Sequence, residues 1–280
     1  MPLKLIFEEA ERRGLNFLSI TDHDSMESQA KALALARENR MSYVTGLELN
    51  ISFSHKDYRD GKPFSLDCLG YGVNINNGAL LAKLEELRAY RRRRAQLIMD
   101  KVNEVLASEG KPLLGNDDIR EVEENVDGTF GRPHIADHLV KKSLAASRQE
   151  AFDRYLVRCN VAKMPVSLEE AASLIRGAGG VIVLAHPNNP RGTSLHAMTK
   201  SLDRQQRIIK ETMLPHLDGL ECWHSSHDSE TVSTYLKFAR DQNMIVTGGS
   251  DCHQQPVIIG TVNVPAWVAD QHELKKRMLP

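Results

Sequence analysis

Histidine and acidic residues recur where the predicted strands end, and their side chains are groups that bind divalent metal ions. Five apolar runs that predict strands finish at or beside such a residue, and these residues are His23, Glu48, His186, His224 and the pair Asp251 and His253. The C-terminal ends of strands in α/β sheets and barrels face one shared crevice. Mixed imidazole and carboxylate ligands suit manganese, iron or zinc better than magnesium or calcium. The sequence therefore predicts a divalent-metal site at one rim of a sheet.

Each of these residues also has a structural interpretation. Asp251 and His253 would point to the same side of an extended chain, or they form a turn with a surface histidine. His186 ends an apolar strand and precedes Pro187, so it is either a ligand or a packed core histidine. Glu48 lies in a predicted buried strand, where a carboxylate needs a metal or an ion-pair partner.

Helices and strands alternate over residues 1–78 and again over 165–280, which predicts a parallel or mixed α/β sheet. Residues 79–164 contain only helical patterns and predict a helical insertion that covers the site as a lid. We expect strands at 16–20, 43–49, 65–73, 180–185, 219–223 and 244–248. We expect helices at 3–13, 28–39, 79–108, 116–125, 132–143, 147–156, 168–178, 195–213 and 229–241. Asp24 is a candidate N-cap of the second of these helices.

The composition is that of an ordinary globular protein. Of 280 residues, 41% are hydrophobic and 26% are charged, and the net charge is −1, so no global basic field attracts nucleic acid. The 4 cysteines form no C-x-x-C pair, which argues against a thiolate zinc site and fits a reducing compartment. The sequence shows neither a signal peptide nor an apolar run of membrane-spanning length. We therefore expect a cytoplasmic protein.

Six short motifs occur in order: Thr21-Asp22-His23-Asp24, Gly46-Leu47-Glu48, Leu69-Gly70-Tyr71-Gly72, Gly131-Arg132-Pro133-His134-Ile135-Ala136, Ala185-His186-Pro187 and Gly249-Ser250-Asp251-Cys252-His253. In order and spacing they resemble the PHP (polymerase and histidinol phosphatase) family, in particular its TrpH-like branch. The resemblance implies a distorted (β/α)7 barrel with two or three divalent ions at its rim, manganese first, with iron or zinc as alternatives. It also implies hydrolysis of phosphate esters, because relatives act on 3′,5′-bisphosphorylated nucleotides and on RNA 5′ ends.

The candidate metal ligands are His23, Glu48, Asp67, His186, Asp251 and His253. Glu48 would bridge two ions and is therefore also a candidate catalytic residue. Asp67 stands where the family usually has histidine, which adds negative charge and changes the expected metal preference. His224 and His227 follow another predicted strand, and we expect them to bind phosphate or to donate a proton. A solvated loop histidine is the alternative for both.

Three candidate substrate-binding residues fall in the predicted insertion. Arg132 and His134 open a predicted helix whose N-terminus would favour anions, and by resemblance their motif contacts the nucleotide phosphate. Arg91 belongs to an arginine run, residues 91–94, that would cover all sides of a helix and is expected to be mostly solvated. Arg91 or Arg94 would then hold a second phosphate.

The family's first motif, a strand carrying His-x-His, has no counterpart before the helix predicted at 3–13. We therefore expect a barrel that lacks its first strand and an enzyme that is weak or inactive. Three functions stay open: a phosphoesterase for nucleotides or RNA and oligonucleotide 5′ ends (a 3′,5′-bisphosphate nucleotide phosphatase or a 5′–3′ exonuclease), a small-molecule phosphatase of the histidinol-phosphatase type, and an impaired domain that only binds. The sequence predicts no membrane partner and leaves the oligomeric state open.

Overall fold

The computed structural model describes residues 2–124, 131–253 and 256–278. The chain divides into two compact units, one formed by Met1–Leu81 with Pro165–Pro280 and the other by Ala82–Met164. Within the described ranges, no helix is long and apolar enough to cross a membrane.

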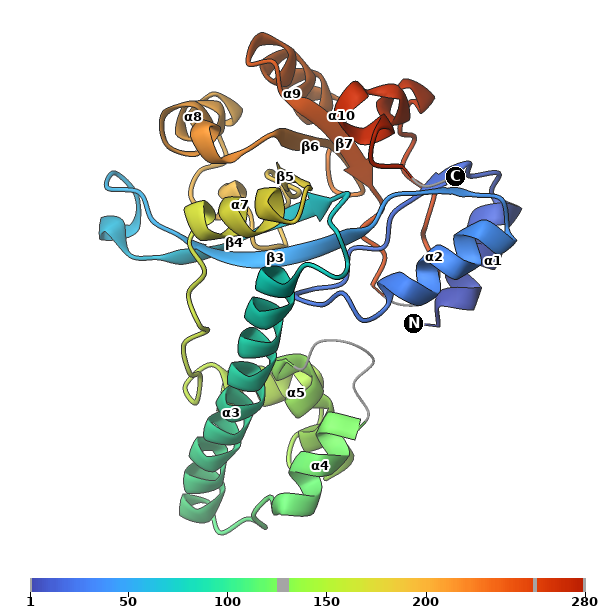
Figure 1. The fold of residues 1–280 in the computed structure, drawn as a ribbon. Coiled ribbons are helices and arrows are strands. Elements are labelled where there is room, and N and C mark those ends of the chain that lie inside the picture. Colours follow the sequence, from blue (N-terminus) through green and yellow to red (C-terminus); the bar gives the residue numbers. More distant parts are fainter. Residues whose placement is uncertain (1, 125–130, 254–255, 279–280) are drawn as a thin grey trace. The chain divides into compact units, whose positions relative to one another are not determined.

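The first unit is built on a five-stranded sheet in the order β3-β4-β5-β6-β7 (Figure 1). Its strands are β3 (Gly46–Phe53), β4 (Phe64–Tyr71), β5 (Val181–Leu184), β6 (Gly219–His224) and β7 (Ile245–Gly249). The pairs β3–β4 and β4–β5 are antiparallel, whereas β5–β6 and β6–β7 are parallel. Two short strands, β1 (Phe17–Leu18) and β2 (Ser42–Tyr43), form a separate parallel pair. The unit is therefore a mixed α/β fold.

The resemblance predicts a barrel that lacks its first strand, and the described part of the chain shows no closed barrel. The residues that follow β1 run beside β3 and form an isolated parallel bridge between His23 and Glu48. The Glu48 N–H donates to the Asp22 carbonyl at 3.0 Å, and the Asp24 N–H donates to the Glu48 carbonyl at 2.7 Å. No strand ladder among the described residues joins β7 to β1. The segment carrying His23 thus extends the sheet at the β3 edge without closing it.

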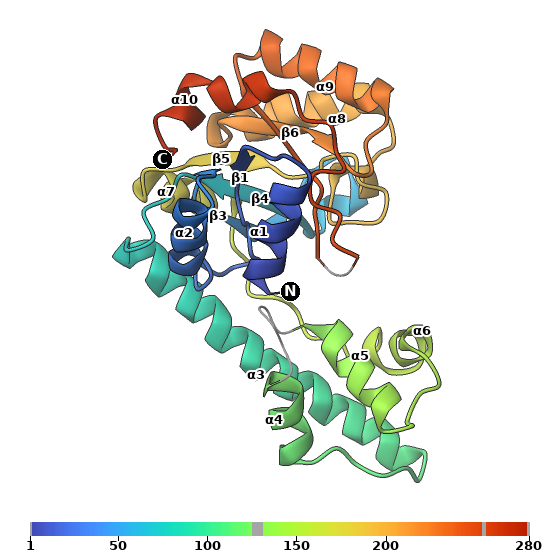
Figure 2. The same cartoon turned by 90° about the vertical axis from the view of Figure 1, so that its right-hand side faces the viewer.

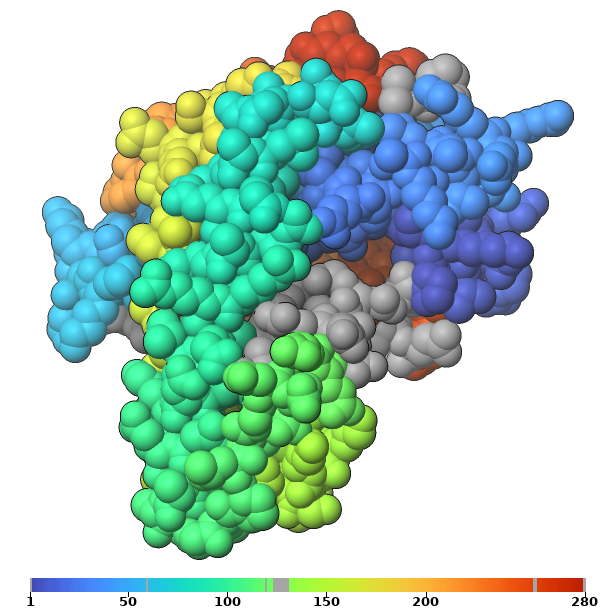
Figure 3. All heavy atoms as spheres, turned by 60° about the horizontal axis from the view of Figure 1, so that its bottom comes forward, coloured from blue at the N-terminus to red at the C-terminus, as the bar shows by residue number. Residues whose placement is uncertain are grey.

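The strands β3 and β4 differ from the prediction in length and position. The strand predicted at 43–49 is divided, and β3 continues to Phe53, which pairs with Phe64 of β4. A hairpin joins the two strands, so they pair antiparallel, and its tip projects from the surface (Figure 3). Glu48 therefore lies inside a strand rather than at its end, and it faces the site from there.

Helices α1 (Leu3–Arg12) and α2 (Gln29–Glu38) pack on the β1–β2 pair. Their contact buries Phe7, Ala10, Ala32, Ala36 and Tyr43. The expected N-cap role of Asp24 is wrong, because α2 begins at Gln29 and Ser28 occupies the N-cap position. The Asp24 carboxylate instead accepts a hydrogen bond from the Asn50 N–H of β3 at 3.2 Å. It thus helps to hold the His23 segment against the sheet.

The remaining helices of this unit are α7 (Leu168–Gly177), α8 (Leu202–Ile208), α9 (Ser229–Asp241) and α10 (His272–Lys275). Ser167 caps α7 and Asp228 caps α9, each by accepting a backbone N–H of the first turn. The helix predicted at 195–213 is broken into a 3₁₀ turn (Leu195–Ala197), α8 and a π turn (Ile209–Met213).

The second unit is helical and carries its own core (Figure 2). The long helix α3 (Gly78–Ser108) begins in the first unit and is followed by α4 (Asn116–Glu124), α5 (Arg132–Lys141) and α6 (Arg148–Ala151). The core that α3 and α5 share includes Ile98, Val102, Leu106, Ile135 and Leu139.

Candidate metal centre

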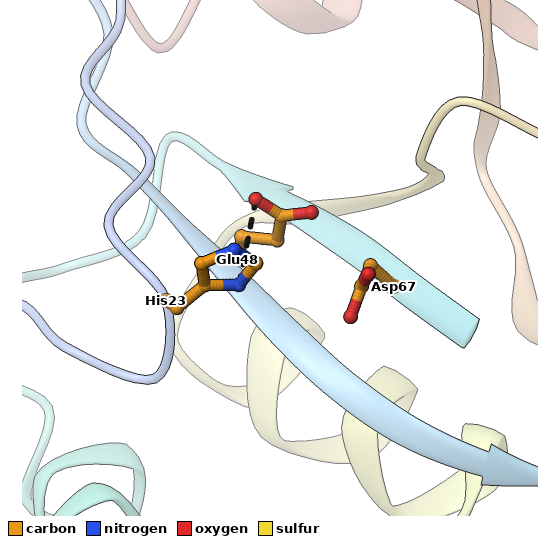
Figure 4. A group of neighbouring side chains, drawn as sticks. All are labelled: His23, Glu48 and Asp67. Carbon is orange, nitrogen blue, oxygen red and sulfur yellow. Dashed lines mark ion pairs between the residues drawn. The ribbon is translucent and has the colours of Figure 1, made fainter. Parts of the chain in front are cut away.

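Three candidate ligands from three segments converge on one point. His23 lies at the bridge to β3, Glu48 lies in β3 and Asp67 lies in β4 (Figure 4). Each offers a ligand atom, and these atoms all lie within 4.8 Å of one another. The His23 Nδ1 is 3.6 Å from the Glu48 Oε2. The antiparallel register of β3 and β4 places the two carboxylates close together, which the sequence alone does not specify.

His186 joins this group from the loop after β5. Its Nε2 is 3.1 Å from Glu48 Oε1 and 3.9 Å from Asp67 Oδ2. Its φ of 28° lies in the left-handed region, which a non-glycine residue adopts only when its surroundings enforce it. The His186 N–H donates to Glu221 Oε2 at 2.7 Å, and this hydrogen bond helps to hold His186 in the left-handed conformation. The same contact identifies Glu221, in β6, as a site residue that the sequence analysis missed.

A second half of the cluster is formed by His224, Asp251 and His253. Asp251 Oδ2 is 3.4 Å from His224 Nε2, and Asp251 Oδ1 is 3.3 Å from His253 Nδ1. The His253 Nε2 lies 3.3 Å from the His23 Nε2, and the His186 and His224 rings are 5.3 Å apart. The candidate ligands therefore form one continuous cluster, as expected from their positions near strand ends.

The electrostatics of the cluster favour a cation. Burial raises the pKa of Glu48, and the neighbouring Asp67 carboxylate raises it further. Burial also raises the pKa of Glu221. Burial opposes protonation of His186, but its hydrogen bond to Glu48 and the surrounding carboxylates raise its pKa overall. Several carboxylates thus lie close together with only histidines to balance their negative charge. A bound divalent ion would supply the missing positive charge.

Two buried ring nitrogens strengthen this fit. Within the part of the chain that the structure describes, His186 Nδ1 and His224 Nε2 have no hydrogen-bond partner. A buried polar atom without a hydrogen-bond partner is costly, and coordination of a metal ion would satisfy both nitrogens. His224 Nδ1 lies 2.7 Å from the Ser226 Oγ, which can accept a proton carried on Nδ1, so the Nε2 lone pair is left to face a cation beside Asp251. The geometry thus favours His224 as a further metal ligand over the predicted phosphate-binding or proton-donating role.

His227 does not have the geometry of a proton donor. Its Nδ1–H donates to the Cys222 carbonyl at 2.9 Å, and its Nε2 accepts the Asn188 N–H at 3.3 Å. Burial lowers the pKa of His227 to about 4, so the ring is neutral at pH 7. The catalytic role expected for His227 conflicts with this geometry, because both ring nitrogens are used to brace the backbone.

Asp67 is held by two neutral side chains. Its Oδ1 accepts the Asn50 Nδ2–H at 2.6 Å, and its Oδ2 accepts the Thr193 hydroxyl. Asn50 is adjacent to Asp67 in the β3–β4 register, whereas Thr193 comes from the loop after β5. Neither residue carries a signal in the sequence. Glu221 does, because it is a charged residue in an otherwise apolar strand, the same feature that identified Glu48.

The expected substrate-binding residues belong to the second unit. Arg132 begins α5 as predicted, and the His134 Nδ1 accepts the Gly131 N–H at 3.0 Å, which caps that helix. The Arg132 guanidinium lies over the Phe152 ring, 5.6 Å from its centroid. Burial and the nearby Arg94 lower the pKa of Arg91 to about 10. Arg94 is buried and donates to the Val161 carbonyl at 2.6 Å.

Comparison with known proteins adds independent information. No family model matches the chain. A 3′,5′-nucleoside bisphosphate phosphatase of Chromobacterium violaceum is 25% identical over 89% of this chain and 80% of its own length. The 5′-3′ exoribonuclease Rnm of Escherichia coli is 26% identical over 90% of this chain and 80% of its own length.

Solved structures give the same picture at the level of the fold. A protein classed as a metal-dependent phosphoesterase, from Bifidobacterium adolescentis, aligns with a TM-score of 0.75 at 26% identity, covering 99% of this chain and 91% of that one. An amidohydrolase from Chromobacterium violaceum, solved with sulfate and no metal, aligns with a TM-score of 0.75 at 24% identity, covering 98% and 90%. The homologues of this chain are thus PHP-type phosphoesterases.

Proposed function

We propose that the chain is a divalent-metal-dependent phosphoesterase that hydrolyses phosphate esters of nucleotides or of RNA 5′ ends. The observation that carries the proposal is the cluster of acids and histidines, which brings imidazole and carboxylate groups from six segments into one continuous group. Structural ion pairs alone would not require so many carboxylates with so few cations. The named activities of the relatives agree with this chemistry.

The ions would be held by His23, Glu48, Asp67, His186, His224, Asp251 and His253, with manganese as the first candidate and iron or zinc as alternatives. When bound, divalent ions lower the pKa of a coordinated water and neutralise phosphoryl oxygens. The carboxylates make the cluster acidic, so a phosphate group would be repelled until cations are bound there. Metal binding is therefore a condition for substrate binding as well as for the reaction.

The choice of a nucleotide substrate rests on the second unit as well as on the relatives. Arg91, Arg94 and Arg132 carry positive charge there. Besides burial, the charge of Arg94 lowers the pKa of Arg91, and the charge of Arg132 lowers the pKa of Arg94. Each guanidinium presents a planar set of donors that matches phosphate oxygens. We assign residues 79–164 the role of a lid that selects substrates, with Arg132 and His134 contacting phosphate and Arg91 contacting a second phosphate.

The test combines metal content with a substrate panel. The purified chain is loaded with Mn²⁺ and its metal is counted by mass spectrometry. Four substrates are then compared: adenosine 3′,5′-bisphosphate, a 5′-phosphorylated RNA oligonucleotide, histidinol phosphate and p-nitrophenyl phosphate. Release of mononucleotides is measured for the RNA, and release of phosphate for the other three. We expect bound manganese and fastest turnover of the first two. Preference for histidinol phosphate would assign the chain to small-molecule phosphatases. Bound metal without turnover of any substrate would make it a binding domain.

A further inference from the structure

A network of polar side chains lies between the loop after β5 and helices α8 and α9, and its centre is Asn188. The Asn188 Nδ2–H donates to Thr231 Oγ1 at 2.9 Å, and the Asn188 Oδ1 accepts the Gln205 Nε2–H at 2.9 Å. The Asn188 backbone N–H donates to His227 Nε2 at 3.3 Å. One residue thus connects the β5 loop to α8, to α9 and to the histidine that follows β6.

The partners of Asn188 are themselves fixed. Gln205 is fully buried, accepts the Tyr235 hydroxyl and also donates to the Thr199 carbonyl at 2.7 Å. Thr231 is 2% exposed. Removing one member of such a network leaves a buried polar group without its partner, which is destabilising. The network therefore defines one position for Asn188.

Asn188 is connected to the metal cluster by two routes. Along the chain, it follows His186 by two residues, with the rigid Pro187 between them. His186 is held at a positive φ, so its direction depends on how firmly the following residues are anchored. Through space, Asn188 holds His227, whose ring lies 5.3 Å from that of His224 and whose Nδ1–H binds the carbonyl of Cys222 in the same strand.

We propose that Asn188 is a positioning residue that directs His186 and His224 toward their shared metal site. The inference rests on the proposed function, because the two histidines are taken as ligands. Residues that orient metal ligands typically contribute about 10–100-fold to metal affinity. His227, which sequence analysis placed in catalysis, acts in this arrangement as the neutral link between Asn188 and the strand that carries His224.

The experiment measures Mn²⁺ affinity by calorimetry on the full chain and on four variants. Thr231→Val keeps the shape but removes the acceptor for Asn188, whereas Thr231→Ser restores the hydroxyl. Asn188→Ala removes the hub, and Asn189→Ala is the control, since the Asn189 side chain accepts the Arg191 N–H of its own loop at 3.0 Å. We expect affinity to fall about 10–100-fold in Asn188→Ala and Thr231→Val, and to be unchanged in Thr231→Ser and Asn189→Ala.

A second readout follows the histidine ring nitrogens by ¹⁵N NMR on the metal-free chain. The His186 and His224 signals should move in Thr231→Val and not in Thr231→Ser. Should Asn188→Ala fail to fold, the two threonine variants carry the test. Wild-type chain that binds no Mn²⁺ would overturn the proposed function and this inference with it. Wild-type chain that binds Mn²⁺, with Thr231→Val binding equally well, would overturn the inference alone.

Discussion

At the scale of single residues, the centre is defined by an excess of buried acid. Glu48, Asp67, Glu221 and Asp251 lie around His186 and His224. The first three are buried and Asp251 is partly buried, so their carboxylate charges are costly. Only the nearby histidines lower the pKa of Asp251, to about 2, against the opposing effect of burial. Replacing a residue that binds the metal should therefore lower metal affinity without unfolding the chain, whereas replacing one that supports the fold should lower stability.

Replacing His186 with alanine should remove bound manganese while the chain remains folded. The change deletes the imidazole that lies 3.1 Å from Glu48 Oε1, so a bound metal ion would have one ligand fewer. We expect Mn²⁺ affinity to fall at least about 100-fold, more than for residues that only orient a ligand. The measurement is calorimetric titration, with His216→Ala in the same unit as the histidine control. Equal affinity in both variants would refute a ligand role for His186.

His224 allows a sharper distinction, because two roles predict opposite results. As a ligand, His224→Ala should lower both bound manganese and turnover. If His224 is instead a proton donor, His224→Ala should leave the metal content intact, lower kcat and remove one limb of the pH–rate profile. The buried Nε2, directed toward Asp251, leads us to expect loss of metal. A fully loaded but slow variant would restore the role first expected from the sequence.

At the scale of elements, the position of the His23 segment depends on β3 approaching it closely. A Cβ atom added at Gly46 would lie 2.5 Å from Ser19 Oγ, 2.7 Å from Thr21 Cγ2 and 3.0 Å from the Ile20 carbonyl oxygen. The carbonyl belongs to the backbone and cannot rotate away. Glycine is therefore required at this position so that the segment leading to His23 can lie against β3.

Gly46→Ala should thus disturb both stability and the metal centre. Overpacking of this kind costs about 1–3 kcal/mol, and the displaced segment would carry His23 away from Glu48. Urea unfolding and Mn²⁺ titration measure the two effects. Gly177→Ala, in α7 of the same unit, is the matched control because a Cβ there meets nothing within 4 Å. If Gly46→Ala were as stable as that control and bound Mn²⁺ as the wild type does, the segment would not depend on this contact.

At the scale of the whole molecule, the chain separates its tasks between two units. The first contains the proposed metal ligands, whereas the second contains the arginines assigned to substrate and an apolar core of its own. Such a division would let substrate preference change without altering the metal centre. It also means that substitutions in the second unit should affect substrates unequally.

Arg132→Ala should raise KM for adenosine 3′,5′-bisphosphate more than for p-nitrophenyl phosphate. The larger substrate has a second phosphate, and the variant removes one charge-assisted contact to it, about 1.5–3 kcal/mol or roughly tenfold or more in KM. Steady-state kinetics on both substrates measures the difference. Arg93→Ala, at an exposed position of α3, serves as the arginine control. Equal increases in KM for both substrates would show that Arg132 has only a structural role, in its contact with Phe152.

The sequence by itself determined the mixed α/β class, the placement of most helices, and the convergence of His23, His186, Asp251 and His253. These follow from local periodicity and from the rule that strand ends share a rim. It could not determine that β3 and β4 form a long hairpin, because pairing register depends on contacts between distant residues. Nor could it identify Asn50 or Thr193 as neighbours of Asp67.

The tertiary structure also decided the roles of two histidines that look alike in the sequence. His224 and His227 are three residues apart, yet their hydrogen bonds differ. Among the described residues, the buried His224 Nε2 has no hydrogen-bond partner, whereas both ring nitrogens of His227 form hydrogen bonds. The difference comes from Asn188 and Cys222, which lie in different segments and become neighbours only when β5 and β6 pair. Residue type indicates which chemistry is possible, whereas the surrounding hydrogen bonds decide which nitrogen is available for it.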